Sequence, residues 1–280
     1  MVFSYSTNAF VKYSLSEAVK LIAQTGFKGV EIMCDRPHLY PPDATKQDLE
    51  ELKQLLESLN LTITNLNCFT LFAVGNTWLP SWIEPDESRR QERIDHTLNC
   101  LDIAHFLGSP CISVPPGGPP VDMSRDASLK LFRQGLEQVI PKAEALGVSI
   151  LIEPEPDLLI ETSSQMSSFI KDFSSPNLGV NFDVGHFYCV GEAPEAALDT
   201  LFDKIGHIHI EDIASTRKHH HLIPGLGAID YDAFFKRLGE LNYTKDVCVE
   251  LYTYTEAPCE AGVKSIETLK PVMEKYGFLV

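Results

Sequence analysis

Four side chains that could bind a metal end short apolar runs in the second half of the chain. The runs close on two glutamates, an aspartate and a histidine, namely Glu153, Asp183, His209 and Glu250. Bringing these groups together costs several kcal/mol of desolvation and repulsion unless a cation compensates. Carboxylates with one imidazole suit Mn²⁺, Mg²⁺, Co²⁺ or Zn²⁺ and leave positions open for substrate oxygens. The four residues therefore predict a site for one divalent metal ion.

Each of these residues has an alternative interpretation. A single glutamate or aspartate at the end of a strand more often caps a helix or pairs with arginine, and only the occurrence of all four favours a metal. His207 and His209 share one face of their strand. We interpret His207 as a deeper, hydrogen-bonded barrel histidine and His209 as the ligand.

The elements that must position these residues alternate along the chain. Amphipathic stretches with helical spacing, such as the leucines between residues 49 and 59, separate short runs rich in valine, isoleucine and leucine. Such runs are typical of parallel strands that are buried on both faces. The eight runs are residues 2–6, 29–33, 61–67, 111–114, 148–153, 178–183, 206–210 and 247–251.

Eight strand–helix units in a chain near the typical length of about 250 residues predict an α/β fold, a (β/α)8 TIM barrel. We expect a single domain over residues 1–280. An open doubly wound sheet is the alternative, but it usually has a glycine-rich fingerprint after its first strand, and none follows residues 2–6. The irregular stretch 69–85, with Trp78 and Trp82, is either a lid or a surface excursion.

Helix boundaries can also be predicted from single residues. Gly26, Gly108 and Gly147 follow three of the amphipathic stretches, where a left-handed residue often ends a helix. Thr162 stands three residues before Gln165, the spacing of a capping box.

Charge and composition exclude several classes of function. With 23 Lys and Arg against 39 Asp and Glu, the net charge of −16 disfavours nucleic acid and anionic membranes. No apolar run reaches the roughly 18 residues of a membrane span. Seven scattered cysteines without a C-x-x-C pair indicate buried, reduced thiols and a cytoplasmic protein. A homo-oligomer stays open, because the outer helices of barrels often support dimers.

The chain resembles the xylose-isomerase-like TIM-barrel superfamily of sugar phosphate isomerases and epimerases over most of its length. The resemblance implies that Glu153, Asp183, His209 and Glu250 hold the metal, and that His186 and Arg217 contact substrate oxygens. The matching segments are 29–32 (GVEI), 151–154 (LIEP), 181–186 (NFDVGH), 206–212 (GHIHIED), 224–230 (PGLGAID) and 247–251 (VCVEL).

The chain departs from the DNA-repair branch of this superfamily. That branch has histidines at the ends of strands three and four, which hold two further zinc ions. Here the corresponding segments read NLNC (65–68) and SVPPG (113–117), so these ligands of a three-metal cluster are missing. Pro115 also replaces a histidine that many relatives have, and Leu226 replaces a residue that is often charged.

The resemblance and the ligand set together predict an isomerase or epimerase that acts on a sugar, a sugar phosphate or a polyol. Glu153 and Glu250 would transfer the proton next to a carbonyl group through an enediolate that the metal stabilises. One alternative is a dehydratase or lyase that acts on a keto-sugar or cyclitol with the same groups. The other is a barrel that binds a sugar without catalysis.

Four further features of the sequence could serve a site or only the fold. Glu31 lies inside an apolar strand, and we expect it to serve a buried polar network. Glu155 either supports a metal ligand or is a loop carboxylate, and we favour the loop carboxylate. The histidines at 219–221 are either a metal-binding tract or a solvated run, and we favour the solvated run. Trp78 and Trp82 either stack on a sugar ring or pack the segment around them.

Overall fold

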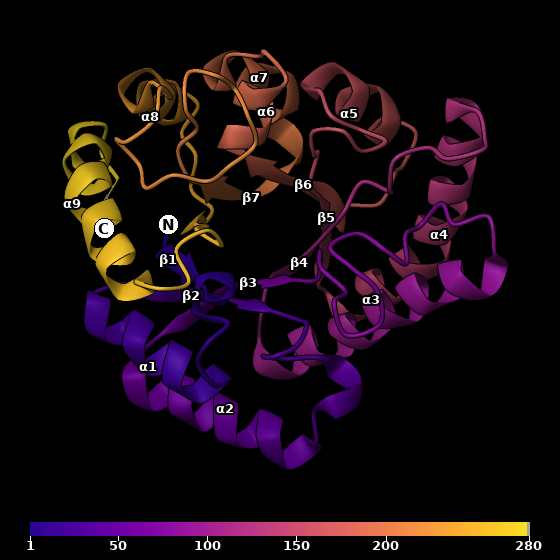
Figure 1. Cartoon of the computed structure of the whole chain (residues 1–280), viewed down its shortest axis with the longest axis horizontal. Coiled ribbons are helices and arrows are strands. Elements are labelled where there is room, and N and C mark those ends of the chain that lie inside the picture. Colours follow the sequence, from indigo (N-terminus) through magenta and orange to yellow (C-terminus); the bar gives the residue numbers. More distant parts are fainter. Residues whose placement is uncertain (279–280) are drawn as a thin grey trace.

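The computed structural model describes residues 1–278. Within them, eight parallel strands pair in sequence order and β8 closes on β1, so that the sheet is a barrel surrounded by helices (Figure 1). This confirms the predicted TIM barrel. The strands are β1 Phe3–Ser6, β2 Gly29–Met33, β3 Thr62–Asn67, β4 Cys111–Val114, β5 Ser149–Ile152, β6 Leu178–Asp183, β7 Ile205–Ile210 and β8 Val247–Val249.

The helices between the strands bury one face against the barrel. In α1, for example, Ala18, Val19 and Ile22 are buried, while the other side of the helix meets solvent. The α-helices are α1 Leu15–Thr25, α2 Lys46–Leu59, α3 Glu87–Leu107, α4 Arg125–Leu146, α5 Ser163–Ile170, α6 Val184–Cys189, α7 Pro194–Leu201, α8 Tyr231–Glu240 and α9 Pro258–Lys275.

The predicted helix boundaries are confirmed. Gly26, Gly108 and Gly147 end α1, α3 and α4 in the left-handed conformation, with φ of 106°, 79° and 67°. Thr162 caps α5, and its hydroxyl and the Gln165 side chain form the predicted capping box. These local signals fix where α5 begins and where α1, α3 and α4 end.

The register of the last strands brings the predicted ligands to one rim. Asp183 of β6 lies opposite His209 of β7. β8 is shorter than the run 247–251 suggested and ends at Val249, so Glu250 directly follows the strand, and its N–H donates to the Ile210 carbonyl at 3.0 Å. The carboxyl ends of these strands therefore meet at the same end of the barrel, where TIM-barrel sites lie.

The segment 69–85 contains no helix or strand. Trp82 packs into the core with 1% of its surface exposed, whereas Trp78 faces a cavity at the barrel mouth. Trp82 thus packs the segment around it, and stacking of Trp78 on a sugar ring stays a prediction. No helix of the described chain is long and apolar enough to cross a membrane.

Candidate metal centre and cavity

The structure brings Glu153, Asp183, His209 and Glu250 into one cluster. One ligand atom from each lies within 4.8 Å of the others, and all four residues are buried. His209 Nδ1 is 3.3 Å from a Glu153 oxygen, 3.7 Å from a Glu250 oxygen and 3.8 Å from Asp183 Oδ2. Three carboxylates and one imidazole thus converge from four consecutive strands, as the sequence predicted.

The electrostatics of this cluster fit a divalent cation. Burial, together with the neighbouring Glu153 carboxylate, raises the pKa of Asp183 to about 6. The pKa of Glu250 is raised well above its ordinary value, mainly by burial. Asp183 Oδ2 is buried and has no hydrogen-bond partner within residues 1–278. A cation among these oxygens would remove both the repulsion and the unmet acceptor.

A polar network below the cluster orients its histidine. His209 Nε2 lies 2.6 Å from a Glu31 oxygen, and this contact favours the tautomer with the proton on Nε2 and a free lone pair on Nδ1. Asn65 and Asn67 donate to the same carboxylate. The expectation that Glu31 serves a buried network is confirmed. His207 is deeper than His209, but it is not hydrogen-bonded within the described chain, and its Nε2 lies 3.4 Å from Glu31.

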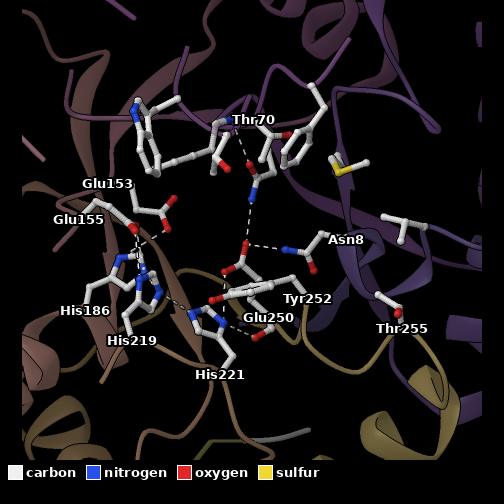
Figure 2. A pocket seen from close by; sticks show the side chains of 17 residues that line it. Asn8, Thr70, Glu153, Glu155, His186, His219, His221, Glu250, Tyr252 and Thr255 are labelled. Atoms are coloured by element: carbon white, nitrogen blue, oxygen red, sulfur yellow. Dashed lines mark hydrogen bonds and ion pairs between the residues drawn. The ribbon is translucent and has the colours of Figure 1, made fainter. Parts of the chain in front are cut away.

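A cavity of about 440 Å³ opens above the cluster (Figure 2). Its volume falls in the range of small-molecule sites. Two kinds of wall are present: polar and acidic groups at the base, and aromatic rings at the mouth. The lining of the cavity includes Asn8, Glu153, Glu155, Glu250, Trp78 and Tyr252.

Three histidines form a second cluster in the cavity wall (Figure 2). The Nε2 atoms of His186 and His221 lie 3.2 Å and 3.1 Å from Nε2 of His219. Each Nδ1 faces an acceptor, the Nε2 atoms face one another, and a Glu155 oxygen lies 3.1 Å from that of His186. Burial lowers the pKa of His186 and of His221. The cluster could hold a cation or accept protons from hydroxyl groups. The acceptors that face the Nδ1 atoms of His186, His219 and His221 are, in this order, the Pro154 carbonyl at 2.9 Å, Glu155 Oε1 at 3.2 Å and the Glu250 carbonyl at 2.9 Å.

Comparison with known proteins places the chain in a family. The model of the xylose isomerase-like TIM barrel matches residues 19–272. The chain belongs to the xylose isomerase-like TIM-barrel family. Inosose dehydratase of Clostridium beijerinckii is 26% identical, over 95% of this chain and 91% of that protein. Fructoselysine 3-epimerase of Escherichia coli O157:H7 is 24% identical, over 92% and 94%. The IolI protein, solved with a bound zinc atom, superposes with a TM-score of 0.83 at 22% identity and full coverage of both chains.

Two parts of this xylose isomerase-like site were missed in the sequence. His219 and His221 were interpreted as solvated, yet His221 is 1% exposed and both line the cavity, whereas His220 between them is exposed. Glu155 was interpreted as a loop carboxylate, yet it is buried and lies 3.1 Å from His186 Nε2. Burial raises the pKa of Glu155 to about 7. The alternation of two histidines around one residue was the available signal for a common face.

The two predicted substrate contacts differ in their positions. His186 lies in the cavity wall at the start of α6. Arg217 is exposed, and its guanidinium stacks over the Tyr188 ring at 4.3 Å and donates to the Tyr188 carbonyl at 2.6 Å. Arg217 is not among the described residues that line the cavity. Its contact with substrate stays a prediction, and it would require the loop to move.

Asp212 folds the loop that carries His219 and His221. Its buried carboxylate accepts N–H groups from Ile213, Gly225, Gly227 and Ile229, at 2.8 to 3.1 Å. Both ends of the loop are thereby tied to one side chain at the end of β7. This long-range contact, rather than the local sequence, turns the two histidines toward the cavity.

Replacing Asp212 by alanine should loosen this loop. Hydrogen bonds to a charged group contribute roughly 1.5–3 kcal/mol each, so we expect the free energy of unfolding to fall by about 3 kcal/mol or more. Urea denaturation measures the loss, and hydrogen exchange should show faster exchange of the Gly225 and Gly227 amides. Asp203→Ala, at an exposed position, is the control. Unchanged exchange at both glycines would contradict the proposed role of Asp212.

Proposed function

We propose that this chain is a divalent-metal-dependent epimerase or isomerase that acts on a small neutral sugar or polyol. One observation carries the proposal. Glu153 and Glu250 both line the cavity and both belong to the four-ligand cluster, with His209 between them. Two carboxylates from different strands can therefore reach one substrate carbon. The zinc atom bound to IolI supports the metal, and the relative fructoselysine 3-epimerase supports the reaction.

The proposed chemistry is proton transfer next to a carbonyl group. A bound divalent cation supplies Lewis-acid stabilisation of negative charge on substrate oxygens. Glu153 or Glu250 removes the proton, and the resulting enediolate takes a proton back. Return to the opposite face of the same carbon, from the other carboxylate, gives an epimer. Return to the adjacent carbon gives the isomer.

Neighbouring amides hold the two carboxylates in place. Asn8 and Asn67 donate to Glu250 Oε1 at 2.8 Å and 3.0 Å, and Asn181 donates to Glu153 Oε2 at 2.8 Å. Each glutamate thus has one oxygen fixed by an amide and a second oxygen for the cation or the substrate proton. Such fixed hydrogen bonds reduce the reorganisation that the reaction requires.

The cavity wall favours a neutral substrate. None of the described residues that line it is a lysine or an arginine, so no guanidinium or ammonium group is placed to pair with a phosphate. Trp78 and Tyr252 offer aromatic surfaces to the apolar faces of a sugar ring. We therefore propose an unphosphorylated substrate. The described cysteines are free thiols, in line with a reducing compartment such as the cytoplasm.

A dehydratase that acts on a keto-sugar or cyclitol is the second candidate. Epimerisation needs two carboxyl groups, and the cavity has a third in Glu155, which contacts His186 and His219 at 3.1 Å and 3.2 Å. Such a group could protonate a leaving β-hydroxyl. The 26% identity with inosose dehydratase favours the same reaction class.

Proton exchange tests the proposal. The protein, loaded with Mn²⁺ or Zn²⁺, is incubated in D₂O with neutral ketoses and inososes and with their phosphates. We expect deuterium to enter a neutral substrate at a carbon next to the carbonyl group, and loss of water from the product would identify the dehydratase. Tight binding of a sugar without exchange would instead support a binding protein, and a preference for phosphates would refute the neutral-substrate proposal.

A further inference from the structure

Three cysteines that are distant in the sequence meet outside the barrel wall. Cys34, Cys68 and Cys100 are each completely buried, and their Sγ atoms lie within 4.8 Å of one another. They are separate from the metal centre at the barrel mouth, whose ligands carry no sulfur.

The fold places these thiols together for simple reasons. Met33 and Asn67 end the paired strands β2 and β3, and both line the cavity. The next residues, Cys34 and Cys68, point to the opposite side because side chains alternate along extended chain. The Cys34 N–H donates to the Asn67 carbonyl at 2.8 Å, which keeps the two segments paired. The two thiols therefore face the helical layer.

Helix α3 adds a thiol and an imidazole. His96 and Cys100 are four residues apart, so they lie on one face of the helix. His96 Nε2 is 3.6 Å from Cys100 Sγ, and His96 Nδ1 is buried without a hydrogen-bond partner in residues 1–278. Thiolates at about 2.3 Å from a tetrahedral zinc ion lie about 3.8 Å apart, so the three Sγ atoms, which lie within 4.8 Å of one another, would have to draw together by up to about 1 Å. The His96–Cys100 separation is already close to this value, and His96 would have to turn toward Cys34 and Cys68.

A buried positive charge beside the thiols is an independent indication. Arg93 is completely buried on α3 and donates only to backbone carbonyls of Cys68, Phe69 and Pro80. Its Nη2 atom has no partner in the described chain. A buried charge without a close ion-pair partner is unfavourable, and the buried Asp35 carboxylate attracts Arg93 without forming an ion pair with it in the described chain. Three thiolates around a divalent cation carry a net charge of −1, which would balance this guanidinium.

We propose that Cys34, Cys68 and Cys100, with His96 as the fourth ligand, bind a zinc ion that ties α3 to strands β2 and β3. The chemistry of the donors selects a thiophilic cation, because thiolates prefer zinc to magnesium or manganese. The site is independent of the proposed catalytic activity.

Cobalt substitution tests the site on the whole protein. The chain is expressed in zinc-poor medium with Co²⁺ and purified without oxygen. We expect near-ultraviolet charge-transfer absorption from thiolate to cobalt, a signature that carboxylates and imidazoles do not give. Cys100→Ser should lose this absorption. Cys111→Ser removes a buried thiol of β4 outside the cluster and should retain it.

Metal analysis gives a second readout that does not depend on the spectrum. Protein expressed with zinc should hold about one equivalent more than Cys100→Ser, as expected for a closed structural site. If Cys100→Ser does not fold, the spectra of Cys34→Ser and of the wild-type protein still test the proposed site. Wild-type protein without the thiolate–cobalt absorption, or with a disulfide between any two of the three cysteines, would overturn the proposal.

Discussion

Replacing Glu153 or Glu250 by glutamine should lower the rate of substrate proton exchange by about 10²–10⁴-fold, the usual contribution of a general acid–base group. Both carboxylates line the cavity and belong to the ligand cluster. Glutamine keeps the size of the side chain and can accept the amide hydrogen bonds of Asn181 or Asn8, but it cannot take up a proton at the reaction pH. The fold should persist, since the substitution also removes repulsion among buried carboxylates.

The measurement is deuterium uptake from solvent at saturating metal ion, with metal content determined on the same samples. Glu137→Gln, on the exposed side of α4, makes the same chemical change away from the cavity and should exchange at the wild-type rate. If both cavity variants exchange near the wild-type rate while they retain metal, proton transfer by these two carboxylates is excluded. A loss in only one of them would assign both transfers to that residue.

The ligand cluster could be predicted because its logic is topological. Once eight apolar runs are interpreted as barrel strands, the residues that end β5 to β8 must share a rim, whatever the loops do. Glu153, Asp183 and Glu250 follow from this rule, whereas the choice of His209 over His207 also needed the expectation that His207 lies deeper in the barrel. The polar network of Glu31 followed from a similar argument, since a carboxylate inside an apolar strand needs buried partners.

The cavity wall was less predictable because it depends on contacts between distant residues. His219 and His221 are next to Arg217, and local composition indicates a solvated loop. Their burial results from the Asp212 carboxylate, which collects N–H groups from both ends of the loop. Glu155 turns inward because its carboxylate contacts the imidazoles of His186 and His219. No local pattern contains these partners.

The cysteine cluster could not be predicted from the sequence either, because it also depends on contacts between distant residues. A search for C-x-x-C pairs finds nothing, and buried thiols were the sequence-based expectation. Cys34 and Cys68 become neighbours only through the pairing of β2 with β3, and Cys100 joins them only because α3 packs over that part of the wall. Ligands separated by more than thirty residues become a set only when strand register is known.

Replacing Asp183 by asparagine should separate metal ligation by this side chain from its contribution to the fold. Asp183 Oδ1 accepts the His186 N–H at 2.8 Å and caps α6, a role that asparagine retains. Oδ2 has no hydrogen-bond partner in the described chain, so its expected function is ligation. We expect metal affinity to fall by at least about 100-fold, more than is usual for a residue that only orients a ligand.

The free energy of unfolding should then rise with metal in the wild-type protein and hardly change in the variant. A cation at 100 times its Kd adds about 2.7 kcal/mol to the free energy of unfolding of the wild-type protein, and the variant should gain almost nothing. Without metal, the variant should be at least as stable as the wild type, because one of three crowded carboxyl groups has become neutral. Thermal unfolding with chelator and with added Mn²⁺ or Zn²⁺ measures both, with Asp203→Asn as the exposed control. A metal-free variant that is much less stable than the metal-free wild type would show that Asp183 supports the fold rather than a cation.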